Sequence, residues 1–184
     1  MNVWELRCAD INDYSMVVPS ELDLLEGLFE IDGRALAWKG IPIVEYADSR
    51  SRGKQKRPVA DVATIGPGAF VLSSRAFDVL GPFLRQFGQL LEVQTAGGAD
   101  FRHLFNVTNL VKCVDAERSE KSASGAVKSE VFYDIHVPRS PAVFKDPLTA
   151  AVRMYTNDPG RELIERLASE AGLTGIECGA PRRF

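Results

Sequence analysis

The sequence predicts an α+β domain, with short helices packed on a mixed or mainly antiparallel sheet. Apolar runs of strand length, some of them alternating with polar residues, recur along the chain. Helix-start signals are few, and the helical stretches that follow them are short. Two stretches also share the order strand, cap, helix, glycine and strand, which predicts two pseudo-repeated units.

The size of the chain favours one domain, spanning residues 1–184. A chain of 184 residues makes one generous domain or two very small ones. Such a chain buries roughly 70% of the surface that its unfolded form exposes, so it needs no metal or disulfide to hold a core.

Three segments in the first 65 residues have the pattern of strands. Residues 3–9 alternate apolar and polar side chains, as a half-buried strand does. Residues 41–47 and 59–65 are further short apolar runs. Because proline lacks a backbone N–H, Pro42 either places its strand near a sheet edge or lies at the start of that strand.

A short helix is expected between the first two of these strands. Ser20 is its candidate N-cap, and acidic residues follow in the first turn. Leu22, Leu25 and Leu28 recur at helical spacing, while Gly27 weakens the helix and predicts that it is short.

The first strand–helix–strand unit is predicted for residues 70–93, where its signals are clear. Residues 70–72 form a short apolar strand, and Ser73 or the serine after it caps a helix. The Gly-Pro pair at 81–82 is expected to kink or restart this helix. Gly88 is expected to close it in the C′ position, before a strand at residues 90–93.

The second unit occupies the last forty residues. Residues 152–155 predict a strand, Thr156 or Asn157 a cap, and residues 162–167 the body of a helix. A glycine ends that helix, and residues 174–178 predict the final strand.

Between the two units lie two further predicted strand segments, residues 96–116 and 129–140. The first starts with a glycine-rich hairpin turn at 96–100. Residues 117–128 separate the segments and have the composition of an exposed loop, which is a candidate for partner contact.

Asn106 opens an N-glycosylation sequon, which functions only in a secretory lumen. The chain shows no basic leader followed by an apolar run, and no stretch of about 18 apolar residues. We therefore expect a cytoplasmic protein without a membrane segment and without a glycan on Asn106.

The cysteines predict neither disulfides nor a zinc site. Cys8, Cys113 and Cys178 are odd in number, lie far apart and form no CxxC pair. A catalytic cysteine needs a histidine base, and the candidates are His103 and His136. Cys113 lies in an apolar run, where an inert buried thiol is the common case. We expect no catalytic residues.

Two other tempting motifs have simple structural interpretations. Asp115, Glu117 and Glu120 form a carboxylate cluster, but the surrounding sequence predicts a solvated turn whose amides these side chains satisfy. The stretch IGPGAF at 65–70 lacks the Lys-Ser/Thr ending of a phosphate-binding loop and predicts a turn before a strand. We expect no cofactor and no metal.

Charge is distributed unevenly along the chain. Residues 1–48 contain ten acids and three bases, a net charge of −7. Residues 49–57, SRSRGKQKR, contain five bases and no acid. This basic stretch has no aromatic residue to stack on bases and belongs to a chain of net charge −3, so the composition argues against nucleic acid as a partner.

Three stretches resemble one family of bacterial proteins. They are residues 73–93, 106–115 and 157–177, which carry the strand–serine–helix–strand unit, the apolar strand with the asparagine pair, and the closing helix with its G-L-T-G-I-E strand. They resemble the Imm-eleven type of immunity protein of bacterial polymorphic toxin systems, formerly a domain of unknown function. The resemblance is strongest over residues 59–178. A Phe-Arg pair typical of the family is Phe-Lys here, at 144–145.

The resemblance implies a non-enzymatic cytoplasmic protein that binds and neutralises a cognate protein toxin, and it leaves homo-oligomerisation open. An immunity protein needs a surface complementary to its toxin, often of opposite charge. The expected partner-binding residues are therefore the acids of the N-terminal surface: Asp10, Asp13, Glu21, Asp23, Glu26 and Glu30.

Two rival classes stay open from the residues alone. A small enzyme would require one of the two histidines to converge with an acid or with Cys113 in a pocket. A regulatory or nucleic-acid-binding module would use the basic loop. The residues of that loop are Arg50, Arg52, Lys54, Lys56 and Arg57.

Overall fold

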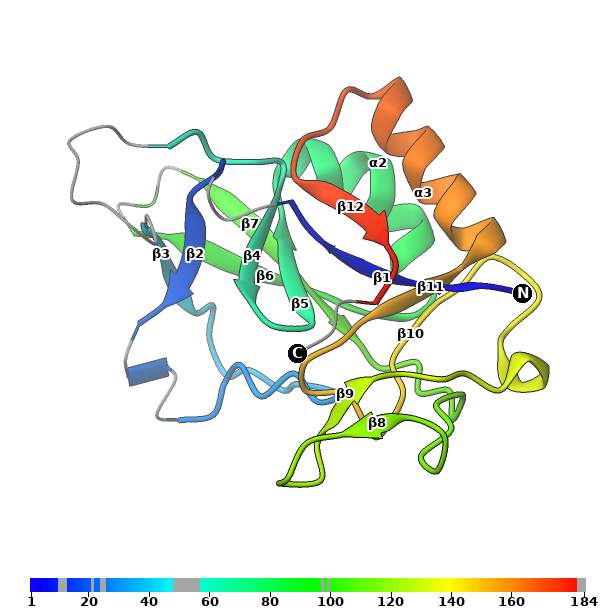
Figure 1. The fold of residues 1–184 in the computed structure, drawn as a ribbon. Helices are drawn as coiled ribbons and strands as arrows, with labels where there is room; N and C mark the ends of the chain where they lie inside the picture. Colours follow the sequence, from blue (N-terminus) through cyan, green and yellow to red (C-terminus); the bar gives the residue numbers. More distant parts are fainter. Residues whose placement is uncertain are drawn as a thin grey trace.

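The computed structural model describes residues 1–9, 13–20, 22–23, 26–47, 57–96, 98 and 100–181 (Figure 1). Its regular elements confirm the expected α+β class, with two helices and twelve strands among the described residues. The helices are α2 (Ser74–Leu84) and α3 (Asp158–Glu170). A short 3-10 helix, η1 (Asp134–His136), follows β9 in the chain. The strands are β1 (Val3–Cys8), β2 (Met16–Pro19), β3 (Ile43–Ala47), β4 (Val62–Gly66), β5 (Ala69–Leu72), β6 (Gly88–Thr95), β7 (Phe101–Val107), β8 (Glu120–Lys121), β9 (Val127–Ser129), β10 (Val143–Phe144), β11 (Tyr155–Asn157) and β12 (Ile176–Gly179).

The larger sheet has six strands in the order β2-β3-β6-β7-β5-β4. All neighbours are antiparallel except β3 and β6. The sheet curls until its two edge strands, β2 and β4, contact one another. Just before β2, the Ser15 backbone N–H donates to the Pro58 carbonyl at 3.0 Å. The sheet therefore has a concave inner face and a convex outer face.

The concave face encloses its own apolar core, to which every strand of the sheet contributes. Its buried residues are Val17, Val44, Ala63, Ala69, Val71, Val93 and Leu104. The segment between β2 and β3 packs against this core through Phe29, Ile31, Leu36 and Trp38. Asn106 and Gln89 fix that segment, since the Asn106 amide donates to the Arg34 carbonyl and Gln89 bonds both backbone groups of Leu36.

The smaller sheet has the order β10-β11-β1-β12, with β1 antiparallel to both of its neighbours. Figure 1 shows this sheet in front of the two helices, which lie side by side. The main core fills the space between the helices and the two sheets, and its largest buried members are Leu6, Phe70, Leu72, Leu80, Leu84, Phe105 and Met154.

Each helix links two strands that flank a third, antiparallel strand. Helix α2 follows β5 and precedes β6, with β7 between them in the sheet. Helix α3 follows β11 and precedes β12, with β1 between them. The two predicted strand–helix–strand units thus both exist, while their origin as a repeat stays a prediction.

Helix α2 confirms one expectation, its N-cap, and corrects two others, the restart at Pro82 and the position of Gly88. Its N-cap is Ser73, as predicted, because the Ser73 hydroxyl accepts from the Ala76 N–H. The helix runs through Pro82 to Leu84 without a restart, and Arg85 is its C-cap. Gly88 was expected in the C′ position, but it opens β6. A Cβ there would overlap the Asn106 carbonyl of the neighbouring strand, so close strand packing explains this glycine.

Helix α3 begins as the sequence predicts, with Asn157 as its N-cap and a proline in the first turn. Gly172 follows its end at φ 59°, a conformation that favours glycine. The strand before it is shorter than residues 152–155 suggest, since β11 starts at Tyr155. Residues 152 and 153 instead pack against the turn between β4 and β5, where a Cβ on Gly68 would lie 2.9 Å from the Arg153 nitrogen.

The two long strands expected at 96–116 and 129–140 are largely wrong. Strand β7 ends at Val107, and beyond it only isolated bridges form. Directly after β7, the N–H groups of Thr108 and Asn109 both donate to the Phe87 carbonyl. Further on, the Asp146 carboxylate accepts from the N–H groups of Cys113 and Val114, both at 2.7 Å, so these groups are not available to a strand. Residues 129–140 are mostly irregular, and the expected loop at 117–128 contains the β8–β9 hairpin.

The first third agrees with the expectations in most respects. Strands β1, β3 and β4 occur where predicted, and Pro42 precedes β3, which pairs on both sides rather than at an edge. The Ser20 hydroxyl accepts from the Asp23 N–H, as an N-cap does. Leu25 of the expected helix lies outside the described residues. Within the described part of the chain, neither helix is long and apolar enough to cross a membrane.

Candidate functional site

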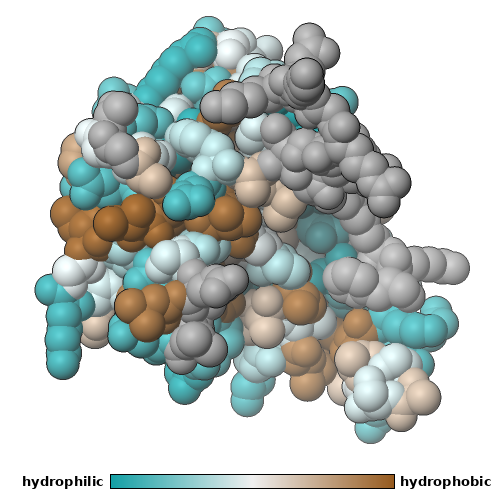
Figure 2. Space-filling view, turned by 90° about the vertical axis from the view of Figure 1, so that its left-hand side faces the viewer, coloured by the Kyte–Doolittle hydropathy of each residue, from teal (hydrophilic) through white to brown (hydrophobic). Residues whose placement is uncertain are grey.

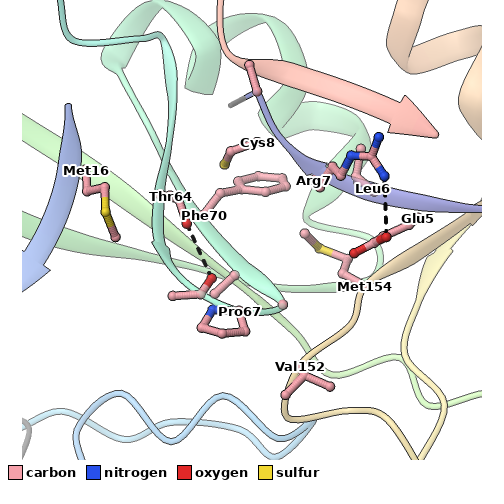
Figure 3. A pocket seen from close by; sticks show the side chains of 14 residues that line it. Glu5, Leu6, Arg7, Cys8, Met16, Thr64, Pro67, Phe70, Val152 and Met154 are labelled. Atoms are coloured by element: carbon pink, nitrogen blue, oxygen red, sulfur yellow. Dashed lines mark hydrogen bonds and ion pairs between the residues drawn. The ribbon is translucent and has the colours of Figure 1, made fainter. Parts of the chain in front are cut away.

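A pocket of about 330 Å³ opens between β1 and the β4–β5 hairpin (Figure 3). Its wall joins the smaller sheet to the convex face of the larger one. The lining residues are Glu5, Leu6, Arg7, Cys8, Ala9, Met16, Thr64, Gly66, Pro67, Gly68, Ala69, Phe70, Val152 and Met154.

The hairpin turn that forms one side of the pocket is fixed by glycine. Gly68 has φ 67° and approaches the backbone of residues 152–153 too closely for a side chain. The Thr64 hydroxyl donates to the Gly66 carbonyl at 3.5 Å, one of the two interactions drawn in Figure 3. Gly66 and Gly68 belong to IGPGAF, and the turn predicted before a strand is confirmed, since β5 follows at Ala69.

The floor of the pocket is apolar and rich in sulfur. Phe70 and Met154 are buried, and Cys8 and Met16 complete the lining from β1 and β2. Burial, and next the Glu177 carboxylate, raise the pKa of the Cys8 thiol. Cys8 is therefore a neutral thiol, which acts as a small apolar group and a poor nucleophile.

The charged wall of the pocket consists of paired groups. Arg7 lies 3.5 Å from the Glu5 carboxylate and 3.4 Å from that of Glu177. It also donates to the Ala180 carbonyl at 3.2 Å. Glu5 in turn pairs with Arg153, whose Nη1 lies 2.9 Å from its Oε2. These contacts suit the wall to hold a bound group in place rather than to move protons.

Behind the wall lies a buried polar cluster centred on Arg153. The Arg153 Nε lies 2.5 Å from Glu130 Oε1, and both side chains are fully buried. The same Glu130 oxygen accepts from the Tyr155 hydroxyl at 3.1 Å, and that hydroxyl bonds Thr149 at 2.9 Å. Burial raises the Tyr155 pKa, so its hydroxyl stays a donor. The cluster fixes Arg153, and through it Glu5.

The acidic residues expected to bind a partner are partly described. Asp13, Glu26 and Glu30 are exposed, and Asp23 is half-buried. Arg34 lies 3.5 Å from the Glu30 carboxylate. Asp10 and Glu21 lie outside the described residues. The structure thus places the described members at the surface at either end of β2.

Of the basic residues that a nucleic-acid-binding module would use, the structure describes Arg57 alone. Arg50, Arg52, Lys54 and Lys56 lie outside the described residues. Arg57 is half-buried, and its carbonyl accepts from the Ser15 hydroxyl at 3.1 Å. This contact belongs to the closure of the larger sheet.

The structure separates Cys113 from the chemistry that a catalytic thiol needs. Cys113 is fully buried, and burial together with the Asp146 charge raises its pKa to about 12. His103 stacks on Phe77, with ring centroids 3.8 Å apart. His136 bonds the Lys112 carbonyl at 3.0 Å through Nδ1. Among the described residues, no hydrogen bond joins either histidine to the thiol.

The carboxylate cluster after Cys113 forms the predicted turn. Asp115 accepts from the N–H groups of Glu117 and Arg118 and pairs with the Arg118 side chain. That side-chain bond is the main cause that lowers the Asp115 pKa to about 2. Within the described residues, no group of three or more histidine, cysteine or acidic side chains is arranged to hold a metal.

Several buried polar residues gave no signal in the sequence. Lys145 is fully buried, and its ammonium donates to the carbonyls of Ile31 and Ala150, each at 2.7 Å. Arg153 and Glu130 look like ordinary surface residues in the sequence. Arg153 follows directly on an apolar stretch, but a strand pattern alone assigns no partner to it.

Compared with known protein families and with curated proteins, the chain matches neither a family model nor a curated relative.

Proposed function

We propose that this chain is a non-enzymatic immunity protein, which binds a cognate bacterial toxin in the cytoplasm and neutralises it. The sequence resemblance to immunity proteins over residues 59–178 is one ground for the proposal. A rigid scaffold that presents a charged surface is what such a role requires.

The observation that carries the proposal is the acidity of the N-terminal surface. Residues 1–48 have a net charge of −7, and the described acids Asp13, Glu26 and Glu30 are exposed. A surface of one charge steers an oppositely charged partner and raises the rate of encounter. The partner expected is therefore a toxin with a basic surface.

The pocket between β1 and the β4–β5 hairpin supports the same proposal. Its apolar floor lies within a wall of paired charges, an arrangement that suits an apolar anchor side chain from a partner. Its thiol is neutral and its carboxylate is paired with two guanidinium groups. Such groups favour binding over acid–base or nucleophilic catalysis.

The proposal predicts a toxin gene beside the gene of this chain, and it is tested by expressing the two together. Cells that express both are expected to grow, and cells that express the neighbour alone are expected to die. Death in the presence of the chain contradicts the proposal.

The acidic surface is tested by charge reversal. The triple variant Asp13→Lys, Glu26→Lys and Glu30→Lys is expected to lower the association rate constant at low salt by at least about tenfold. A matched control reverses three exposed acids elsewhere: Glu120, Glu162 and Glu170. It changes net charge equally and is expected to retain most of the rate. Equal rates for both variants contradict a local acidic interface.

A further inference from the structure

The convex face of the larger sheet is only partly covered by α2. The helix packs over the end of the sheet where Leu90 and Phe105 form part of the main core. Further along the same face, Phe101 and Ile43 lie in one row, because each pairs with Gln94 of β6. Directly paired residues of adjacent strands point to the same face. Ile43 and Phe101 therefore lie two strands apart, roughly 10 Å.

The apolar side chains of this row are exposed. Ile43 is 51% exposed and Phe101 40%, and Ile41, two residues before Ile43, is 50% exposed. Figure 2 views the molecule from the side of β2 and β3, where hydrophobic side chains gather in a band over part of the surface. Clustered exposed apolar side chains rimmed by polar ones mark interaction sites more often than scattered ones do.

The formal charges on the outward positions of β3, β6 and β7 are all negative. Glu45 and Glu92 are exposed and lie on the same face as the row. Glu45 is two residues after Ile43 in β3, and Glu92 is two residues before Gln94 in β6. His103 is the next outward residue of β7 after Phe101. Burial lowers the pKa of His103, and the negative charges of Glu92 and of Asp78 on α2 partly oppose this. The outward positions of β3, β6 and β7 hold no lysine or arginine. These positions are 43, 45, 47, 88, 90, 92, 94, 101, 103, 105 and 107.

We infer that the row of Ile41, Ile43 and Phe101 is the centre of the interface with the toxin. It takes a protein surface that is apolar at its centre and carries lysine or arginine at its rim. The inference rests on the proposed function and adds to it an apolar centre flanked by Glu45 and Glu92. Apolar side chains at the centre of an interface supply most of its binding free energy, and charges at the rim mainly set the encounter rate.

The charge pattern disfavours two other occupants. A second copy of this chain, docked through the same face, would bring Glu45 and Glu92 of both copies together, and like charges repel. The chain's own basic stretch at residues 49–57 has complementary charge, but its sequence SRSRGKQKR contains no apolar side chain to cover the row.

The test compares three single variants by calorimetric titration with the purified product of the neighbouring toxin-like gene. Ile43→Ser and Phe101→Ser are each expected to weaken binding, raising the dissociation constant by at least about tenfold. The matched control is Ile135→Ser, since Ile135 is 88% exposed on η1, outside the sheet. It is expected to bind like the unmodified chain.

The outcomes separate the inference from the proposed function. If the unmodified chain binds and protects cells, and both row variants bind equally well, the inference is wrong and the proposed function stands. If the unmodified chain neither binds nor protects, both are wrong. If Ile43→Ser instead dissociates a dimer of the free chain in sedimentation, a second copy occupies the face and the inference is wrong.

A polar position keeps the test valid should a row variant unfold. Gln94 lies between Ile43 and Phe101, and Gln94→Lys leaves both apolar side chains in place. The added ammonium would face a basic partner, so binding is expected to weaken at least tenfold while the melting temperature stays unchanged. Unchanged binding by this folded variant overturns the inference.

Discussion

Arg153 and Glu130 form an ion pair in which the guanidinium Nε lies 2.5 Å from the carboxylate and neither side chain is exposed. Arg153 also reaches Glu5 at 2.9 Å, so one buried cation lies between two carboxylates. The pair joins the segment after β9 to the segment before β11, and it holds the wall of the pocket.

Removing this cation is expected to destabilise the fold strongly. Arg153→Met removes the cation that pairs with the buried Glu130 carboxylate, which costs on the order of 3–5 kcal/mol, while Glu5 keeps its contact with Arg7. The measurement is the free energy of unfolding in urea. Arg34→Met is the control, because Arg34 pairs with Asp32 and Glu30 at a side-chain exposure of 72%. Arg34→Met is expected to leave the free energy of unfolding unchanged. If both variants lower this free energy equally, the buried cluster does not have the stabilising role described.

Lys145 is expected to make stability depend on pH. Burial lowers its pKa from 10.5 to about 8 in the folded chain. Between these values the unfolded chain binds more protons than the folded one, so stability rises with pH across this window. The cost of burying the charge is fully present below pH 8 and amounts to about 3 kcal/mol.

Comparison with Lys145→Gln isolates this effect from other groups that titrate in the same range. The unfolding free energy of the unmodified chain minus that of the variant is expected to increase by about 3 kcal/mol from pH 7.5 to 10.5. A difference that stays constant over this range shows that Lys145 does not titrate as its burial implies.

Asn157 is expected to matter more than a simple helix cap. It accepts from the Gly160 and Ala142 N–H groups, and its amide donates to the carbonyls of Pro138 and Ser140. Asn157→Ala is expected to cost more than about 2 kcal/mol, the upper end for a cap alone.

Ser73 is the comparison, since among the described residues its hydroxyl caps α2 and otherwise bonds only the Asp61 carboxylate. Ser73→Ala is expected to cost about 1 kcal/mol. Thermal melts and urea titrations of the two variants measure the difference, and a smaller loss for Asn157→Ala rules out the multiple role.

Gly88 is expected to tolerate no side chain. A Cβ there would overlap the Asn106 carbonyl, so Gly88→Ala must push β6 and β7 apart and is expected to cost at least about 1–3 kcal/mol. Gly66→Ala is the control, because a Cβ at Gly66 meets no atom within 4 Å. It is expected to change stability by less than about 0.5 kcal/mol. Similar changes in stability for the two variants would show that the close approach of β6 and β7 at Gly88 does not require a glycine.

The sequence predicts the parts of this fold that local signals determine. The Ser73 and Asn157 caps follow from side-chain chemistry next to apolar helical spacing, and both are confirmed. Strand β7 was predicted to continue past Val107, and this is wrong. Beyond it, the amides of Cys113 and Val114 bond Asp146, more than thirty residues later, instead of a neighbouring strand. A local pattern carries no information about such a distant partner.

The candidate site shows the same division. Hydrophobic alternation locates β1 and its polar Glu5, but it gives no indication that Glu5 pairs with Arg153, which lies just before the neighbouring strand β11. The exposed row of Ile43 and Phe101 depends on strand order and on the length of α2. Both are tertiary properties. The acidic N-terminal surface, by contrast, follows from composition alone, and its described members Asp13 and Glu26 are exposed.

The most direct test of the central claim is inhibition of the neighbouring gene's toxin product by the purified chain. The toxin's own activity is measured while the chain is added from substoichiometric to excess amounts. A toxin-binding immunity protein is expected to abolish the activity at a stoichiometric ratio, with a 1:1 complex in size-exclusion chromatography. Full toxin activity at a tenfold molar excess of the chain, with no complex, would contradict the account.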